Sequence, residues 1–190
     1  VHQNNISHSL SHSSVFALYK DTQGGIWIGT YFGGVNYYNP TDDHTSYYEA
    51  NPDMPHALSF PVVGKMQEDA EHNLWICTEG GGLNFLDRQT RQFTRYVHNK
   101  GGLSGIGHNN LKCIWLRKET GQLYIGTHTG GLTIFDTRKK TAHTLKNSPD
   151  KANSLPSNVI NDLQPYKGKL VLSTQAGIVA MNPETETFEP

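Results

Sequence analysis

The sequence predicts an all-β fold, a β-propeller fragment of four four-stranded antiparallel blades. Three observations carry this prediction. A stretch of about 48 residues is written four times along the 190 residues, glycine pairs recur inside the copies, and hardly any segment shows helical periodicity. Apolar residues make up 35% of the chain and charged residues 17%, which is typical of many short strands joined by turns.

The repeat is clearest at residues 24–40, "GGIWIGTYFGGVNYYNP", and returns at 72–88, at 121–137 and, more divergent, at 168–183. Positions that recur at the same step are expected to serve the fold. The anchors are Trp27, Trp75, Tyr124 and Val171, and the threonines are Thr30, Thr78, Thr127 and Thr174. The glycines are Gly29, Gly33, Gly34, Gly81, Gly82, Gly126, Gly130, Gly131 and Gly177.

Each copy is expected to form four strands, called a to d. In the first copy, strand a lies near Val15, b near Trp27, c near Val35 and d near Tyr47. A single blade cannot bury both of its faces, so neighbouring blades must stack on it. We therefore expect one partial propeller over residues 1–190. Its blades cover approximately 8–50, 58–98, 103–146 and 155–190.

The glycine pair at Gly33 and Gly34 lies between strands b and c. A tight hairpin there needs positive φ, which glycine supplies without steric cost. A phosphate-binding loop would instead open a helix and occur once. The glycines are therefore interpreted as architecture, and no cofactor is predicted.

The stretch "DTQGGIWIGTYFGGV" at 21–35 strongly resembles the two-component regulator propeller repeat. Residues 68–83 match it well, with His72 in place of a glycine and Cys77 in place of another. Residues 121–132 match with Tyr124 for tryptophan, while the fourth copy has lost the aromatic anchor and the first glycine of the pair. The resemblance covers essentially the whole chain.

The resemblance implies a function that composition does not. Propellers of this kind form periplasmic sensor regions of hybrid two-component systems in Bacteroidetes, where they sense oligosaccharides from host or dietary glycans. A following β-sandwich and membrane helix carry the signal to a cytoplasmic histidine kinase and response regulator. The expected function is therefore a periplasmic, glycan-sensing propeller segment that is not itself an enzyme. The alternative is a structural element whose blades only brace a neighbouring propeller or a dimer partner.

The chain is expected to hold four whole blades with no spare strand to close a ring by sharing. Family sensor regions usually contain two seven-bladed propellers, so these blades would belong to a larger ring. Either the four blades close tightly, or the flanks of the first and last blade are exposed. Exposed apolar flanks favour self-association, so a homodimer is expected, with the remaining blades of the parent chain as the natural partners.

Candidate ligand-binding residues come from positions that differ between the copies. The b–c turns and the d–a connections at 49–60, 97–110 and 146–158 should lie at the same edge of each blade. They offer aromatic, acidic, imidazole and amide groups, an inventory that suits an oligosaccharide. The candidates are Tyr31, Phe32, Glu79, His128, Gln175, Asn109, Asn110 and Asn158. The alternative is that exposed turn residues vary because nothing constrains them.

Metal and catalytic sites are not predicted. His8 and His12 have the i, i+4 spacing of a metal face, but that spacing works only on a helix. Glycoside hydrolysis needs two carboxylates that flank one pocket. Glu79 is the only acidic residue at the b–c positions, and Asp21 and Asp69 are expected to stabilise the a–b turns at the opposite edge.

Charge and hydropathy argue against further classes of binding partner and against membrane insertion. The formal net charge of −1 argues against nucleic acid or an anionic membrane as the main partner. No apolar run approaches the roughly 18 residues of a membrane span, so this segment is not expected to insert into a membrane. No signal peptide opens the chain, so composition by itself predicts no compartment. Cys77 and Cys113 lie in apolar runs and are expected to be buried, a disulfide or catalytic thiol being the alternative.

Overall fold

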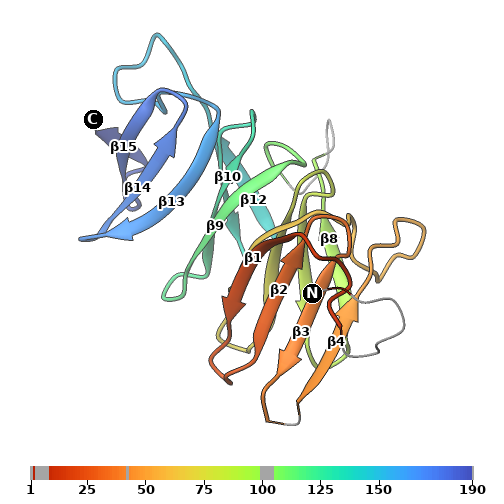
Figure 1. The fold of residues 1–190 in the computed structure, drawn as a ribbon. Coiled ribbons are helices and arrows are strands. Elements are labelled where there is room, and N and C mark those ends of the chain that lie inside the picture. The colour runs from red at the N-terminus through yellow and green to blue at the C-terminus, as the bar shows by residue number, and fades with distance from the viewer. Residues whose placement is uncertain (1, 3–8, 42, 99–104, 190) are drawn as a thin grey trace. The chain divides into compact units, whose positions relative to one another are not determined.

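The computed structural model describes residues 2, 9–41, 43–98 and 105–189. This part of the chain contains sixteen strands and no helix. The strands form four antiparallel sheets of four strands each, and within every sheet neighbouring strands follow one another in the sequence (Figure 1). The predicted all-β class, with four four-stranded blades, is confirmed.

The strand bounds follow the repeat. The first two sheets consist of β1 (Val15–Lys20), β2 (Ile26–Thr30), β3 (Val35–Asn39), β4 (His44–Tyr48), β5 (Val63–Glu68), β6 (Leu74–Thr78), β7 (Leu83–Asp87) and β8 (Gln92–Tyr96). The last two consist of β9 (Leu111–Arg117), β10 (Gln122–Thr127), β11 (Leu132–Asp136), β12 (Thr141–Leu145), β13 (Ile160–Tyr166), β14 (Lys169–Thr174), β15 (Gly177–Asn182) and β16 (Thr187–Glu189).

The chain divides into two compact units, Val1–Tyr96 and Val97–Pro190. The first unit holds the sheets β1–β4 and β5–β8, and the second holds β9–β12 and β13–β16. In each unit the first strand of the second sheet contacts the first strand of the first sheet, β5 on β1 and β13 on β9. The two sheets of a unit therefore stack face to face.

The core of the first unit lies between its two sheets. Trp27 on β2 and Val35 on β3 pack with residues of β5 and β6, including Val63 and Ile76. Leu58, from the connection that joins the two sheets, is fully buried in the same cluster. Burial of such side chains contributes about 1.5–3 kcal/mol each, so this interface dominates the stability of the unit.

The second unit repeats this plan with different side chains. Tyr124 and Leu132 of its first sheet pack with Leu170 and Met181 of its second sheet, and Leu155 of the connection is fully buried with them. The same connection position thus supplies a buried leucine in both units.

The anchor side chains are held by polar partners as well as by packing. The indole nitrogen of Trp27 donates to Asp21 Oδ2 at 2.9 Å, and the indole nitrogen of Trp75 donates to Asp69 Oδ2 at 3.2 Å. The other carboxylate oxygen of each aspartate accepts backbone N–H groups of its a–b turn. These contacts confirm the turn-stabilising role predicted for the two aspartates. They also satisfy indole donors that would otherwise be buried without a partner.

Candidate functional site

The b–c turns are built identically, which separates their scaffold from their variable residues. In the first turn, Thr30 Oγ1 accepts from Gly33 N at 2.9 Å and donates to Gly34 O at 3.0 Å. The turns at Thr78 and Thr127 repeat both hydrogen bonds. The fourth turn is one residue shorter, and the Thr174 hydroxyl makes the corresponding bonds across it. The threonine therefore fixes each turn from inside.

The two glycines of each pair have different roles, which corrects the prediction that both supply positive φ. Gly34 has φ of 72°, and its copies Gly82, Gly131 and Gly177 also have positive φ. Gly33 does not, and it is needed instead because a Cβ there would lie 2.5 Å from Ser11 Oγ. That serine begins the connection into strand a, so the first glycine allows the connection to approach the turn.

The connection and the turn are joined by a buried amide in the first unit. Ser11 N donates to Asn36 Oδ1, Asn36 Nδ2 donates to Ser11 Oγ, and that hydroxyl donates to Gly33 O. Ser59 and Asn84 make the same contacts in the second sheet. The b–c turns and the d–a connections therefore share one edge of each sheet, as the sequence predicts. We call this edge the loop edge.

Aromatic residues gather at the loop edge of the first sheet. The rings of Tyr31 and Phe32 lie 4.4 Å apart, and the ring of Phe16 lies 4.9 Å from that of Tyr31. All three are exposed, at 39%, 58% and 50% for Tyr31, Phe32 and Phe16. His12 lies edge-on to Phe32 at 6.4 Å. Sequence reasoning missed Phe16, although "SVFALYK" places it on the opposite face of β1 from the packed Ala17 and Tyr19.

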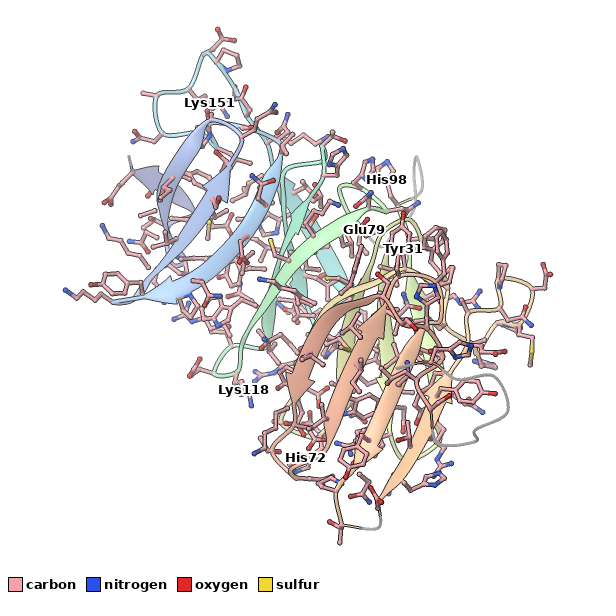
Figure 2. All side chains as sticks on the ribbon, in the orientation of Figure 1. Tyr31, His72, Glu79, His98, Lys118 and Lys151 are labelled. Atoms are coloured by element: carbon pink, nitrogen blue, oxygen red, sulfur yellow. The ribbon has the colours of Figure 1, made fainter. Side chains whose placement is uncertain are left out.

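The other candidate of the first unit, Glu79, lies at the same edge of the second sheet. Figure 2 shows Tyr31 and Glu79 at one end of the strands and His72 at the opposite end. The side chain of Glu79 is half buried, and its backbone N–H donates to Val62 O. Glu79 therefore offers a carboxylate at the loop edge of the second sheet.

The loop edge of the second unit carries imidazoles in place of aromatic rings. His128 is exposed in the b–c turn, and its backbone N–H donates to Asn110 O. Burial lowers the pKa of His108 below its usual 6.5, and the nearby imidazoles of His128 and His98 lower it further. No group of three or more His, Cys, Asp and Glu residues in the described ranges is arranged to hold a metal ion. His8, of the predicted spacing pair, lies outside the described residues.

The amide candidates of the second unit divide into two kinds. Asn109 Oδ1 accepts from His98 N at 2.6 Å, and Asn158 Oδ1 accepts from Asn147 N at 2.8 Å, so both side chains brace their own connections. Asn110 Oδ1 is buried and has no hydrogen-bond partner within the described residues. Gln175 is exposed in the short fourth turn. Of the amides, Asn110 is thus the one whose oxygen still needs a donor.

The opposite end of the strands carries the a–b and c–d turns, and we call it the hairpin edge. In the first unit it contains a buried ion cluster. Arg88 Nη1 lies 3.0 Å from Asp21 Oδ2 and 3.7 Å from Glu68 Oε1, and both acidic side chains are fully buried. The guanidinium also lies 5.2 Å from the ring centre of Trp27.

His72 completes this cluster from a strained backbone. It has φ of 66° at a position where Gly24 has φ of 91° in the first copy. Its Nδ1 lies 3.0 Å from both Glu68 Oε1 and Thr22 Oγ1. Because one nitrogen makes both contacts, the three groups do not form the relay of a nucleophile triad, in which the two ring nitrogens serve different partners.

The electrostatics of Glu68 follow from these partners. Burial by itself would raise its pKa, but hydrogen bonds from Thr22 and His72 outweigh this and lower the pKa below the ordinary 4.5. Both carboxylates of the cluster are therefore engaged by protein donors, with Arg88 between them. The arrangement is that of a structural ion cluster rather than an acid–base pair.

The comparisons with known proteins agree with the repeat. Residues 9–32 match the family described as two component regulator propeller. The predicted resemblance is confirmed. The chain carries a two-component regulator propeller repeat. No curated protein matches the chain at a significant level.

Solved structures extend this likeness over the rest of the chain. The extracellular domain of the putative hybrid two component system BT3049 from B. thetaiotaomicron has a TM-score of 0.81 and 27% identity, covering 100% of this chain and 25% of that one. The corresponding domain of BT4673 has a TM-score of 0.72 and 27% identity, covering 93% and 24%. The chain thus spans about a quarter of the length of these domains.

A more distant structure shows the fold alone. PorZ, a surface component of the type-IX secretion system of Porphyromonas gingivalis, has a TM-score of 0.70 and 14% identity, covering 100% of this chain and 29% of that one. Among the described residues of the chain, no helix is long and apolar enough to cross a bilayer.

Proposed function

We propose that this chain is a ligand-sensing segment of the periplasmic region of a hybrid two-component regulator, and that its ligand is an oligosaccharide. The observation that carries the proposal is the exposed aromatic cluster of Phe16, Tyr31 and Phe32 at the loop edge. The likeness to the extracellular domains of B. thetaiotaomicron systems supports the location. The kinase and response regulator would lie elsewhere in the parent protein, so this segment is proposed to bind and not to catalyse.

The cluster suits a sugar for a physical reason. Aromatic faces pack against the apolar face of a sugar ring, and a few polar groups then fix its orientation. Tyr31 supplies a hydroxyl, and His12 lies beside Phe32. Exposed aromatic side chains on a rigid turn lose little entropy when a ligand binds, because the threonine and glycine contacts already hold the turn.

Sensing requires more than binding. Only a ligand with different affinity for two states of the receptor can shift their balance. A ligand at the loop edge contacts a b–c turn and a strand a, and the adjacent connections lead into the neighbouring sheet. We propose that the ligand acts on the arrangement of these connections relative to the remaining blades of the parent chain.

The test is titration of the chain with a panel of oligosaccharides by calorimetry, repeated with Tyr31→Ala and Phe32→Ala. Loss of aromatic stacking should weaken binding by about threefold to tenfold for each ring. Tyr47→Ala is the matched control, because Tyr47 is an exposed tyrosine on β4, at 55%, outside the aromatic cluster. Unchanged affinity in both loop-edge variants, with folding intact, would reject the site.

A second candidate function, structural bracing, is favoured by a different observation. Leu18 on β1 is 70% exposed, on the face of the first sheet that turns away from the unit's core. An exposed apolar sheet face favours packing against another blade or a second copy of the chain. We expect light scattering over a concentration series to show self-association that Leu18→Lys abolishes. A monomer at every concentration would count against bracing by a second copy.

A further inference from the structure

The hairpin edges of the two units carry different side chains at the junction between their sheets. The first unit also has a cavity at this edge, of about 620 Å³, with His72 and Arg88 in its walls. In the first unit, three side chains of the second sheet lie at this junction. In the second unit, the fourth sheet has uncharged residues at the same repeat positions. The replaced pairs are Glu68 and Pro165, His72 and Gly168, and Arg88 and Pro183. Strand pairing fixes this register, since Glu68 lies opposite Leu74 and Pro165 lies opposite the equivalent Leu170.

The hairpin edge of the second unit has a cavity of about 270 Å³. Its walls include Trp115 and Arg117 from β9, Pro165 and Tyr166 from β13, and Pro183 after β15. We call it the Trp115 groove. All of these residues belong to the second unit. Figure 2 shows Lys118, the residue after Arg117, at this end of the strands.

The walls of the Trp115 groove are suited to a ring. Trp115 is half buried and packs on the core through its contact with Tyr124, so its orientation is fixed. Tyr166 is 60% exposed, and Lys167 Nζ lies 5.1 Å from the centre of its ring. Proline rings add rigid apolar surface. Flat apolar walls of this kind bind planar or ring-shaped groups with little reorganisation.

The groove carries a guanidinium where the first unit carries a buried carboxylate, because strand register places Arg117 at the position of Asp21. Lys167, Lys169 and Glu119 also line the cavity, and Lys169 is paired with Glu189. Arg117 is paired with Glu184, whose side chain is 69% exposed. Exposed ion pairs of this type contribute little, so a ligand carboxylate can take the place of Glu184.

We propose that the Trp115 groove binds a small cyclic carboxylate, whose ring packs on Trp115 and Tyr166 and whose carboxylate pairs with Arg117. The ligand would fill the space that Arg88 and Glu68 fill in the first unit. Ligand cavities usually measure about 300–1,000 Å³, so 270 Å³ corresponds to a ligand of about one ring. The proposal is independent of the loop-edge site, which lies at the other end of the strands.

The chain provides its own reporter for a binding test. Of its three tryptophans, Trp27 and Trp75 are buried in the first unit at 1% exposure, whereas Trp115 lines the groove. We would titrate the chain with glucuronate, with benzoate and with neutral glucose, following tryptophan fluorescence and heat. The expected result is saturable binding of a carboxylate, with neutral glucose binding at least about tenfold more weakly. Glucuronate binding assigns a sugar acid, and benzoate binding assigns an aromatic acid.

Three variants make the test specific. Tyr166→Ala should weaken binding by about fivefold, and Arg117→Gln should remove the preference for carboxylate over neutral ligand. Pro183→Arg restores the filler of the first unit and should abolish binding. Tyr47→Ala, in the first unit, is the matched control for Tyr166→Ala and should leave affinity unchanged.

Two outcomes overturn the proposal. One is the absence of a saturable change for every carboxylate up to about 10 mM, since a one-ring ligand with an ion pair should bind at least at millimolar strength. The other is binding that Tyr166→Ala and Arg117→Gln leave unaltered. If Pro183→Arg fails to fold, as shown by circular dichroism, Tyr166→Ala and Arg117→Gln still decide the question.

Discussion

At the hairpin edge, the two units place different side chains at the junction between their sheets. In the first unit, Asp21, Glu68 and Arg88 fill the junction between the sheets with charges that partner one another. In the second unit, Pro165 and Pro183 stand in the places of Glu68 and Arg88 and line the Trp115 groove. The strands and their pairing are nevertheless the same. Strand pairing therefore does not depend on which side chains lie at this edge, although a charge buried there needs its partner.

At the loop edge, in contrast, the same contacts recur from sheet to sheet. The threonine contacts of the b–c turn recur in all four sheets, including the divergent fourth one. A buried leucine or isoleucine of the connection also recurs, at Leu58, Ile106 and Leu155. Side chains vary between these fixed points, which is where the aromatic cluster and the imidazoles lie.

The largest expected effect comes from breaking the charged junction. Arg88→Ala leaves Asp21 and Glu68 buried without their cation, which should lower the free energy of unfolding of the first unit by about 3–5 kcal/mol. Urea unfolding followed by Trp27 and Trp75 fluorescence, in a Trp115→Phe background, measures this. A loss below about 1 kcal/mol would show that the cluster is not a buried ion network.

A smaller and shared effect is expected at the loop edge. Thr78→Val and Thr127→Val each remove a hydroxyl that makes two hydrogen bonds inside a buried turn. Each should lower the free energy of unfolding of its unit by about 2 kcal/mol, measured by urea-dependent hydrogen exchange of the strands of each unit. Similar losses in both units would support a common scaffold. A loss confined to one unit would contradict it.

Acid should distinguish the two junctions. The pKa of Glu68 is lower in the folded chain than its ordinary 4.5, so Glu68 stabilises the first unit above that pH, and this stabilisation is lost as pH falls through the folded pKa. Burial raises the pKa of Asp69, which acts in the opposite direction. Glu68→Gln should therefore reduce the loss of stability below about pH 4.5, measured as melting temperature against pH. Pro165 gives the second unit no titrating group at this position.

The smallest effect is expected at the exposed pair of the second unit. Glu184→Gln removes the partner of Arg117 and should change the free energy of unfolding by about 0–1 kcal/mol, because Glu184 is 69% exposed. It should also leave Arg117 available, so carboxylate binding in the Trp115 groove should strengthen. Calorimetry compares the two chains, and weaker binding in the variant would contradict the assigned role of Arg117.

Much of the fold follows from the repeat. The spacing of Trp27, Trp75 and Tyr124 places strand b of three sheets, and the structure confirms each of them. The turn roles of Asp21 and Asp69 were also readable, because carboxylates ahead of glycine turns accept backbone N–H groups. The repeat explains only the second glycine of each pair, which has positive φ. The first glycine is needed because Ser11 closely approaches Gly33, and these two residues are 22 positions apart in the sequence.

The candidate site was less accessible from sequence. Tyr31 and Phe32 were found because they vary inside a constant turn, whereas Phe16 joins them through pairing of β1 with β2. Asn109 and Asn158 are candidates because of their position in the repeat. In the structure, their side-chain oxygens accept hydrogen bonds from backbone N–H groups of their own connections. Such contacts depend on chain geometry that residue types do not encode.

The sequence by itself determined the all-β repeat, because periodic anchors and glycines act locally on each hairpin. Only the tertiary structure decided which side chains meet between the two sheets of a unit. Arg88 reaches Asp21 across 67 positions of sequence, and Pro165 lines the same cavity as Trp115, because stacked sheets bring equivalent positions together. The shape and charge of such a junction depend on several residues that are distant in the sequence. These residues come together only in the folded chain.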